Sequence, residues 1–270
     1  MAEKPEESVP LSLADELKRA LTNDEFFLVY QPSIDLRTNA FAGVEALIRW
    51  RHRERGVVAP DEFIDNLEES GLIVEVGRWA LRTACLQGAT WHDKGYRFSV
   101  SVNVSHKQLS SSQFVNDVAI ALKVSGFDPL LLVLEFSQDT VLDGQESNTP
   151  HIQDVKALGV RLAVDDYEPG SSSLDDLAKV GIDIIKLNRE FIGELANSSQ
   201  SPALIGELVK LAKQRHLQVT ASGVEDAQQR RQLQIEQVST GQGYLFSVPH
   251  EAEEIDLYLE DFAIFSGKPL

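Results

Sequence analysis

Carboxylate and carboxamide side chains recur at or near the C-terminal ends of successive β-like segments of this chain. They are Glu45 in GVEALIR, Asn103 in SVNVS, Glu135 in LVLEFS, and Asp165 with Asp166 in LAVDDY. Because an unpartnered carboxylate inside a strand costs several kcal/mol or more, their repetition indicates a shared cation. Oxygen ligands of this kind suit Mg²⁺ or Mn²⁺, with Ca²⁺ as the alternative. The pattern therefore predicts a divalent-metal site.

Apolar runs bounded by turn or helix signals predict the strands that hold these residues. Eight such runs lie at roughly 26–35, 42–50, 98–105, 130–137, 160–166, 182–188, 217–221 and 240–246. Stretches with helical spacing separate most of them, at 74–87, 107–124, 152–158, 174–180, 203–215 and 227–235. This alternation is typical of a mainly parallel sheet with crossover helices. Because eightfold barrels take about 250 residues, we predict an α/β fold, a TIM-type (β/α)8 barrel in one domain.

Functional side chains of such a barrel gather where the strands end and the following loops begin. Besides the acids, Lys186, Glu225 and Gln242 fall at this place. Each residue alone also has a structural interpretation, such as Asn103 as a helix cap or Lys186 as the partner of a structural carboxylate. Their common position at one end of the barrel favours a functional cluster.

The composition narrows the classes of partner. A formal net charge of −17 argues against general nucleic-acid binding, which uses a basic surface. A small phosphorylated ligand is still compatible with a locally positive pocket, where Arg49 is the best phosphate candidate because guanidinium pairs bidentately with phosphate oxygens. No run approaches the roughly 18 apolar residues of a membrane span, so we expect a cytoplasmic protein with no membrane partner. Residues 1–12 are predicted to be a disordered leader and 13–270 the barrel domain.

Cysteine and histidine usage excludes other kinds of site. Cys85 is the single cysteine, so there is no disulfide framework and no cysteine metal site, and we expect it to pack inside a helix. The six histidines show no paired metal spacing, which argues against a histidine zinc site. The long connection 52–97 carries helical segments at 61–69 and 74–87. We interpret it as an insertion within the barrel and not as a second domain.

Ordered motifs along almost the whole chain carry a family resemblance. They are Tyr30-Gln31-Pro32, Glu45-Ala46-Leu47 with Arg49, PDEFIDNLEESGLI at 60–73, Val102-Asn103-Val104-Ser105, Leu134-Glu135, Asp165-Asp166, Ile185-Lys186-Leu187, Gly223-Val224-Glu225, and Gln242-Gly243-Tyr244-Leu245-Phe246 with Pro249. The chain resembles the EAL domain family of cyclic di-GMP phosphodiesterases and their inactive relatives. The resemblance implies a modified TIM barrel whose first strand runs antiparallel to its neighbours.

The resemblance also implies a chemistry for the cluster. Mg²⁺ or Mn²⁺ would activate a water that hydrolyses one phosphodiester of cyclic di-GMP to the linear dinucleotide. The positions that match the family's metal ligands are Glu45, Asn103, Glu135, Asp165 and Asp166. The matching catalytic positions are Lys186, which would orient the water or stabilise developing charge, and Glu225. The matching ligand-binding positions are Arg49 on a phosphate, Gln31 or Leu47 beside a guanine, and Gln242.

Several positions depart from the pattern of active relatives. Ser222 replaces the first glutamate of Ala-Glu-Gly-Val-Glu, which removes a base and a charge implicated in water activation or in a second metal site. Gln138 replaces a glutamate that supports the loop after the Asp-Asp pair. That loop reads DDYEPGSSSL in place of DDFGTGYSSL, and its Glu168 and Pro169 restrict the backbone where relatives have Gly and Thr. Asn188 replaces an acid, and 236–239 lacks the usual Leu-Gly-Cys-Asp.

Three functions fit these matches and departures, in the following order. The first is a signalling receptor that binds cyclic di-GMP at the C-terminal barrel mouth with little or no hydrolysis. The second is a slow metal-dependent phosphodiesterase in which Glu225 or another nearby acid compensates for Ser222. The third is a protein-interaction scaffold that has lost both ligand and activity. A protein partner or a homodimer is a further expectation, and the sequence leaves enzymatic activity open.

Overall fold

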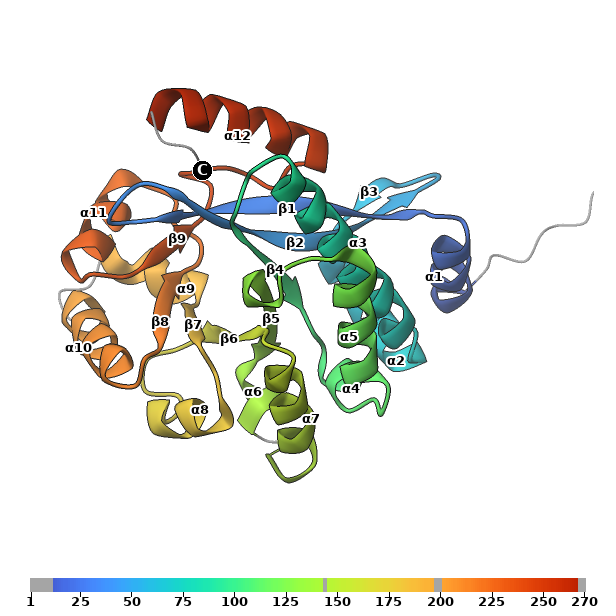
Figure 1. Ribbon diagram of the computed structural model, residues 1–270, viewed down its shortest axis with the longest axis horizontal. Helices are drawn as coiled ribbons and strands as arrows, with labels where there is room; N and C mark the ends of the chain where they lie inside the picture. The colour runs from blue at the N-terminus through green and yellow to red at the C-terminus, as the bar shows by residue number, and fades with distance from the viewer. Residues whose placement is uncertain (1–11, 143–144, 197–200, 267–270) are drawn as a thin grey trace, which may run out of the picture.

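Strands close into a barrel surrounded by helices in the computed structural model, which describes residues 12–142, 145–196 and 201–266 (Figure 1). Within these ranges the barrel strands are β1 (Phe26–Asp35), β2 (Phe41–His52), β4 (Ser99–Asn103), β5 (Leu132–Ser137), β6 (Arg161–Tyr167), β7 (Ile184–Leu187), β8 (Gln218–Ala221) and β9 (Thr240–Gln242). A short strand that the sequence does not predict, β3 (Gly56–Val58), extends β2 as a hairpin. The predicted barrel is confirmed.

Strand β1 runs in the opposite direction to the other barrel strands. It pairs antiparallel with β2, in a register that runs from Phe26 opposite Trp50 to Ile34 opposite Phe41, and antiparallel with β9. The remaining barrel neighbours, from β2 and β4 round to β8 and β9, all pair in parallel. The C-terminal ends of these parallel strands therefore meet at one face of the barrel. The antiparallel first strand that the resemblance implies is confirmed.

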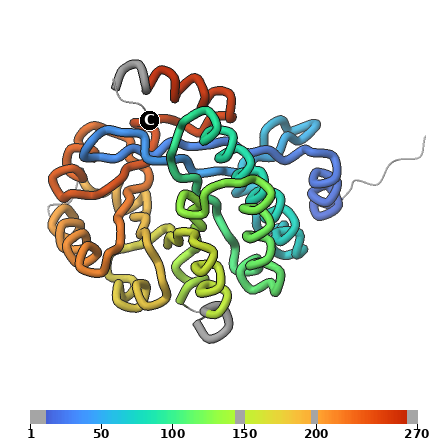
Figure 2. Tube along the Cα trace, in the orientation of Figure 1, coloured from blue at the N-terminus to red at the C-terminus, as the bar shows by residue number. Residues whose placement is uncertain are grey.

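Helices cover the outside of the barrel (Figure 2). In the described residues they are α1 (Leu13–Thr22), α2 (Ile64–Ser70), α3 (Ile73–Asp93), α4 (His106–Leu109), α5 (Phe114–Ser125), α6 (Gln138–Leu142), α7 (Gln145–Ala157), α8 (Leu174–Val180), α9 (Arg189–Gly193), α10 (Ser201–Gln214), α11 (Ala227–Ile235) and α12 (Ala252–Ser266). Side-chain caps begin several of them, including Asp226, whose carboxylate accepts from the first turn of α11. Gly126 ends α5 with a φ of 70°, a conformation that favours glycine. Among the described residues, no helix has the length and apolar character needed to cross a membrane.

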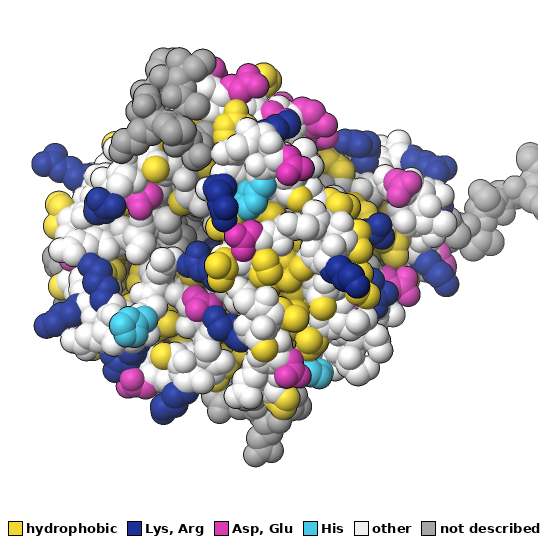
Figure 3. All heavy atoms as spheres, in the orientation of Figure 1, with side chains coloured by type: hydrophobic (Ala, Val, Ile, Leu, Met, Phe, Trp, Pro, Cys, Tyr) yellow, Lys and Arg dark blue, Asp and Glu magenta, His cyan; other side chains and the backbone are white. Residues whose placement is uncertain are grey.

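The main hydrophobic core lies between the barrel and the helices. Tyr30 packs edge-on against Trp91 of α3 there, with ring centroids 4.9 Å apart. Cys85 is buried inside α3 as predicted, and burial raises its pKa to about 12. Apolar side chains also gather on the surface over α3 and α5 (Figure 3), where Ile120 and Val124 are exposed. The core therefore packs the outer side of the strands against the helices, and polar residues occupy the strand ends.

Differences from the predicted elements have local causes. The predicted helix 107–124 is divided into α4 and α5 by a turn, and the last strand ends at Gln242, just before a turn at residues 244–246. Helix α9 has only five residues, too few for a periodic pattern, and is started by the Asn188 cap. Helices α1, α6 and α12 are also absent from the predicted elements. Residues 1–11 of the predicted leader lie outside the described residues, while Ser12 caps α1.

Candidate functional site

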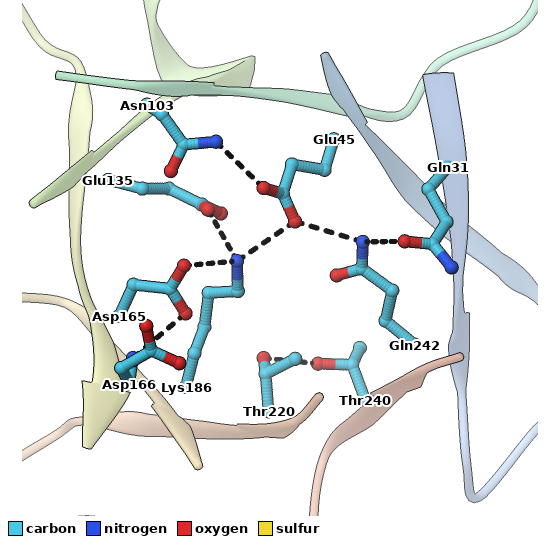
Figure 4. Close-up of polar contacts among 10 residues, drawn as sticks. All are labelled: Gln31, Glu45, Asn103, Glu135, Asp165, Asp166, Lys186, Thr220, Thr240 and Gln242. Carbon is cyan, nitrogen blue, oxygen red and sulfur yellow. Dashed lines mark hydrogen bonds and ion pairs between the residues drawn. The ribbon is translucent and has the colours of Figure 1, made fainter. Parts of the chain in front are cut away.

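A buried lysine gathers three of the predicted acids at the C-terminal mouth of the barrel (Figure 4). Lys186 of β7 is 3% exposed. Its Nζ lies 3.0 Å from Glu45 Oε2, 2.5 Å from Glu135 Oε2 and 3.2 Å from Asp165 Oδ2. The acids come from β2, β5 and β6, and they meet because parallel strands end at the same face. Sequence segments far apart in the chain thus form one ionic cluster, which we call the Lys186 cluster.

Amide side chains complete the surroundings of Glu45. Asn103 Nδ2 donates to Glu45 Oε1 at 2.8 Å, and Gln242 Nε2 donates to Glu45 Oε2 at 2.9 Å. The same Gln242 nitrogen lies 3.1 Å from Gln31 Oε1, and Gln31 is opposite Glu45 in the β1–β2 register. These neutral donors hold the Glu45 carboxylate in one orientation without adding charge.

The charges of the cluster do not balance. Burial opposes ionisation of Glu45, but Lys186 and the two amides outweigh it and lower the pKa of Glu45. For Glu135, burial together with repulsion from Glu45 and Asp165 outweighs Lys186 and raises the pKa to about 8. Burial also opposes the charge of Lys186, yet the surrounding carboxylates raise the Lys186 pKa well above its usual value. One ammonium therefore faces more carboxylates than it neutralises, and the mutual repulsion of the carboxylates favours proton uptake by the cluster as a coupled unit.

The donor set fits a divalent cation. Glu45, Glu135 and Asp165 each offer a carboxylate oxygen, and these atoms lie within 4.8 Å of one another. Hard oxygen ligands with surplus negative charge suit Mg²⁺ or Mn²⁺. Asn103 adjoins this group through its bond to Glu45.

Asp166 lies beside this group and not within it. Its backbone has a φ of 52°, which is unfavourable for a residue other than glycine, and its N–H donates to Asp165 Oδ1 at 3.0 Å. Burial and the nearby Asp165 charge raise the pKa of Asp166. Strain of this kind is concentrated at functional positions in proteins, although it does not by itself assign a ligand.

Two hollows open beside the cluster. The larger, of about 710 Å³, extends from Asn103 and Glu135 to an apolar wall under α2 and α3. The smaller, of about 220 Å³, has Lys186 among its lining residues. Seven more of the sequence-predicted residues line the smaller hollow, and they are Gln31, Glu45, Leu47, Asp165, Asp166, Glu225 and Gln242. The structure thus brings these predicted residues around one space.

Arg49 lies apart from the lining of both hollows. It is half-buried, and its guanidinium NH1 donates to the carbonyl of Ile48 at 2.7 Å. Burial lowers its pKa, an effect that the nearby Tyr244 and Asp61 oppose. One guanidinium N–H of Arg49 is therefore used by the Ile48 carbonyl, and its other donors are available for a ligand.

Ser222 and Glu225 lie on the β8 side of the smaller hollow. The Ser222 hydroxyl is buried and has no hydrogen-bond partner among the described residues. The Glu225 carboxylate is bound 2.5 Å from the guanidinium of Arg189, which also lies over the ring of Tyr244. Tyr244 was visible in the Gln-Gly-Tyr motif, but nothing in the sequence indicates the Arg189 contact.

The unusual loop after Asp166 is tied to its surroundings. Ser171 Oγ donates to Gln138 Oε1 at 2.7 Å, so Gln138 contacts the loop. Asn188 Nδ2 donates to Glu168 Oε1 at 3.1 Å, while Asn188 Oδ1 accepts from the N–H of Phe191 and caps α9. An acid at position 188 would keep the cap but would lose the donor and repel Glu168. Asn188 and Glu168 are therefore matched to each other.

Comparisons with known proteins agree with this arrangement. The EAL domain family model matches residues 14–249. The chain is 33% identical over 261 residues to the cyclic di-GMP phosphodiesterase NbdA of Pseudomonas aeruginosa, and 36% identical over 242 residues to the cyclic di-GMP phosphodiesterase PdeR of Escherichia coli. These alignments cover 96% and 90% of this chain but 33% and 36% of the relatives. The chain thus spans about a third of the length of the curated relatives it matches.

A solved structure shows the same fold. The PaMucR phosphodiesterase in its c-di-GMP complex superposes with a TM-score of 0.86 at 33% sequence identity. The match covers 91% of this chain and 100% of that chain.

Proposed function

Because this chain belongs to the EAL domain family, we propose that it binds cyclic di-GMP at the C-terminal mouth of its barrel and hydrolyses it little or not at all. The observation that carries this proposal is the contrast between an intact group of carboxylates and the missing carboxylate at position 222. The carboxylates of the Lys186 cluster are in place, whereas position 222 offers only a hydroxyl that has no hydrogen-bond partner in the described part of the chain. A receptor needs only contacts that bind the unreacted ligand, while turnover also needs a base and charge stabilisation in the transition state.

The metal belongs to the same proposal. Glu45, Asn103, Glu135 and Asp165 would hold one Mg²⁺ or Mn²⁺, with Asp166 adjoining. A bound ion of this kind polarises phosphoryl oxygens and makes a bound water more acidic. Lys186 keeps the carboxylates together when no ion is bound, since its ammonium contacts three of them.

The deciding experiment is a calorimetric titration with cyclic di-GMP, with and without Mg²⁺, together with analysis of the products. We expect saturable binding and little or no linear dinucleotide. Rapid appearance of the linear dinucleotide would favour the phosphodiesterase alternative, which the intact carboxylate group supports. Absence of any binding would favour the scaffold alternative, for which the exposed Ile120 and Val124 are the supporting observation.

Removing the guanidinium of Arg49 tests the proposed pose. We expect Arg49→Ala to weaken cyclic di-GMP binding about 10-fold or more, because a hydrogen-bonded charge contributes about 1.5–3 kcal/mol. The matched control is Arg51→Ala, two residues along β2, whose exposed side chain pairs with Glu251. Calorimetry measures both variants, and equal affinity in Arg49→Ala and Arg51→Ala would remove Arg49 from the binding site.

Metal binding should stabilise the fold. We expect Mn²⁺ at about 100 times its dissociation constant to stabilise the protein by about 2.7 kcal/mol through mass action, which scanning fluorimetry records as a higher melting temperature. Glu135→Gln keeps the shape of the side chain but removes a ligand charge, so it should lose most of the rise. A melting temperature indifferent to Mn²⁺, Mg²⁺ and Ca²⁺ would contradict the proposed site.

The affinity for Mg²⁺ should rise with pH. A carboxylate must lose its proton to bind a metal, and the pKa of Glu135 is raised to about 8. Below that pKa the metal displaces a proton, so the apparent affinity should increase by up to about tenfold per pH unit from pH 6 to pH 8 and then level off. Calorimetry at pH 7 in two buffers of different ionisation enthalpy counts the proton released. A flat affinity over this range would show that the cluster is already fully ionised.

A further inference from the structure

The barrel interior below the Lys186 cluster is lined by small hydroxyl side chains. TIM barrels normally fill this space with layers of bulky branched residues. Here the inward positions include Ser33 of β1, Ser99 and Ser101 of β4, Thr220 of β8 and Thr240 of β9, around a cavity of about 240 Å³. Figure 4 shows Thr220 and Thr240 side by side next to Lys186 and Gln242. We call this cavity the interior chamber.

Along β4 the inward-facing side chains are more exposed than the outward-facing ones, which is the reverse of a packed barrel. The outward-facing Val100 and Val102 are 0% and 4% exposed under the helices, while the inward-facing Ser99 and Ser101 are only half-buried. An inward side chain can be accessible only if the space beside it admits a water-sized molecule. The apolar inward residues Val133, Ala163 and Ile184 form a separate small group on the β5, β6 and β7 side.

Hydrogen bonding indicates what fills the chamber. Thr220 and Thr240 bond to each other, with Oγ1 atoms 2.6 Å apart, but the side-chain hydroxyls of Ser33 and Ser101 form no hydrogen bond among the described residues, although their backbones pair within the sheet. Glu135 lines the chamber, and its carboxylate, which can accept about four hydrogen bonds, has Lys186 as its described partner. A polar cavity of this size holds several water molecules, whereas only apolar cavities stay dry.

The chamber and the smaller hollow share a wall. Glu45, Lys186 and Gln242 line both, so the cluster separates the chamber from the mouth where the ligand is proposed to bind. At the other end the chamber reaches Arg161 and Gln218, the first residues of β6 and β8, which lie at the N-terminal face of the barrel. A ligand that covers the mouth would leave this second end of the chamber uncovered, and there the Arg161 guanidinium donates to Gln218 Oε1.

We propose that the interior chamber is a water-binding site that hydrates the Lys186 cluster from the N-terminal face of the barrel and helps to hold its carboxylates in place. The presence of water in the chamber does not depend on the proposed function. The effect of the chamber on metal binding does rest on the proposed function. Ser101 and Thr220 are positioning residues in this scheme, because they act on the carboxylates through the water they bind.

Nuclear Overhauser effects between water and methyl groups test the chamber directly. In protein with labelled Thr and Val methyl groups, we expect water contacts at Thr220 and Thr240 and none at the outward-facing, fully buried Val100. These contacts should persist when cyclic di-GMP saturates the protein. Absence of water contacts at Thr220 and Thr240 would overturn the proposal. Their loss with bound ligand would show that the chamber fills through the mouth, which would overturn the N-terminal route.

Drying the chamber tests its effect on the cluster. The double variant Ser101→Val with Thr220→Val should lose the water contacts and bind Mn²⁺ about tenfold more weakly, since hydrogen-bond partners behind metal ligands typically contribute 10–100-fold to affinity. Thr90→Val, an exposed position on α3, is the control. Unchanged Mn²⁺ affinity in a dried chamber would overturn the supporting role. If wild-type protein binds no Mn²⁺, the proposed metal site fails, while the water contacts still decide the chamber.

Discussion

Hydrolysis of cyclic di-GMP should increase by about 10²-fold or more when Ser222 and Gln138 are both replaced by glutamate. Loss of a general base typically costs about 10²–10⁴ in rate, and a hydroxyl with no adjacent base cannot replace a carboxylate at neutral pH. Ser222 lines the hollow that Lys186 and Asp165 also line, although its own hydroxyl is buried. Chromatographic measurement of the linear dinucleotide under Mg²⁺ or Mn²⁺ gives the rate.

Each half of this double variant has its own role. Ser222→Glu supplies the base and a negative charge. Gln138 already accepts from Ser171 in the loop after Asp166, so Gln138→Glu keeps this contact and strengthens it by charge. Ser222→Glu alone should give a smaller gain, because a misplacement of about 1 Å in a catalytic group costs on the order of 10²-fold.

The matched control is Ser222→Gln with Gln138→Glu, which adds the same bulk at position 222 but no base. It should remain as slow as the wild-type protein. Equal gains in the Glu and Gln variants would show that volume and not basicity was limiting. Wild-type protein that hydrolyses the dinucleotide as fast as a relative with the full motif, measured side by side, would overturn the receptor proposal.

The Lys186 cluster could be predicted from the sequence because the periodic pattern of strands and helices determines where its residues lie. Glu135, Asp165 and Lys186 lie near the end of an apolar run, and Glu45 lies within the longer run 42–50, opposite Ser101 of β4. Parallel strands bring such positions to one face whatever the details of the loops. Even so, the sequence does not distinguish Asp166, next to Asp165, whose left-handed backbone sets it beside the carboxylate group and not within it.

Contacts that depend on side-chain direction could not be predicted. Arg189 reaches Glu225 from the start of α9, and Asn188 reaches Glu168 across the loop, because of turns that no periodic pattern encodes. Glu225 is consequently held by a cation, which weakens the case that it compensates for Ser222. The polar inward positions of β4 and β8 alternate with apolar ones as in any strand, so the sequence does not reveal that they enclose a cavity.

The second large effect is expected in Lys186→Met. This change leaves Glu45, Glu135 and Asp165 together in a buried site without their counter-charge, and removal of one partner from a buried ion pair costs about 3–5 kcal/mol. Urea denaturation at pH 8.5 without metal should show a loss of this size in the free energy of unfolding. The control is Lys179→Met, an exposed lysine paired with Asp176, which should leave the free energy of unfolding nearly unchanged.

The loss in Lys186→Met should shrink as the pH falls. Lys186 lowers the pKa of Glu45 and opposes the raised pKa of Glu135, so its loss should raise the pKa of both carboxyl groups in the folded variant. The folded variant then binds more protons than the unfolded chain, so its stability is fully recovered below the unfolded carboxyl pKa and is lost progressively as the pH rises towards the folded values. Saturating Mn²⁺ should also recover stability, because the ion supplies the missing positive charge. A loss that is the same at pH 5.5 and pH 8.5, with and without Mn²⁺, would mean that Lys186 acts through packing alone and that the three carboxylates do not form a cation site.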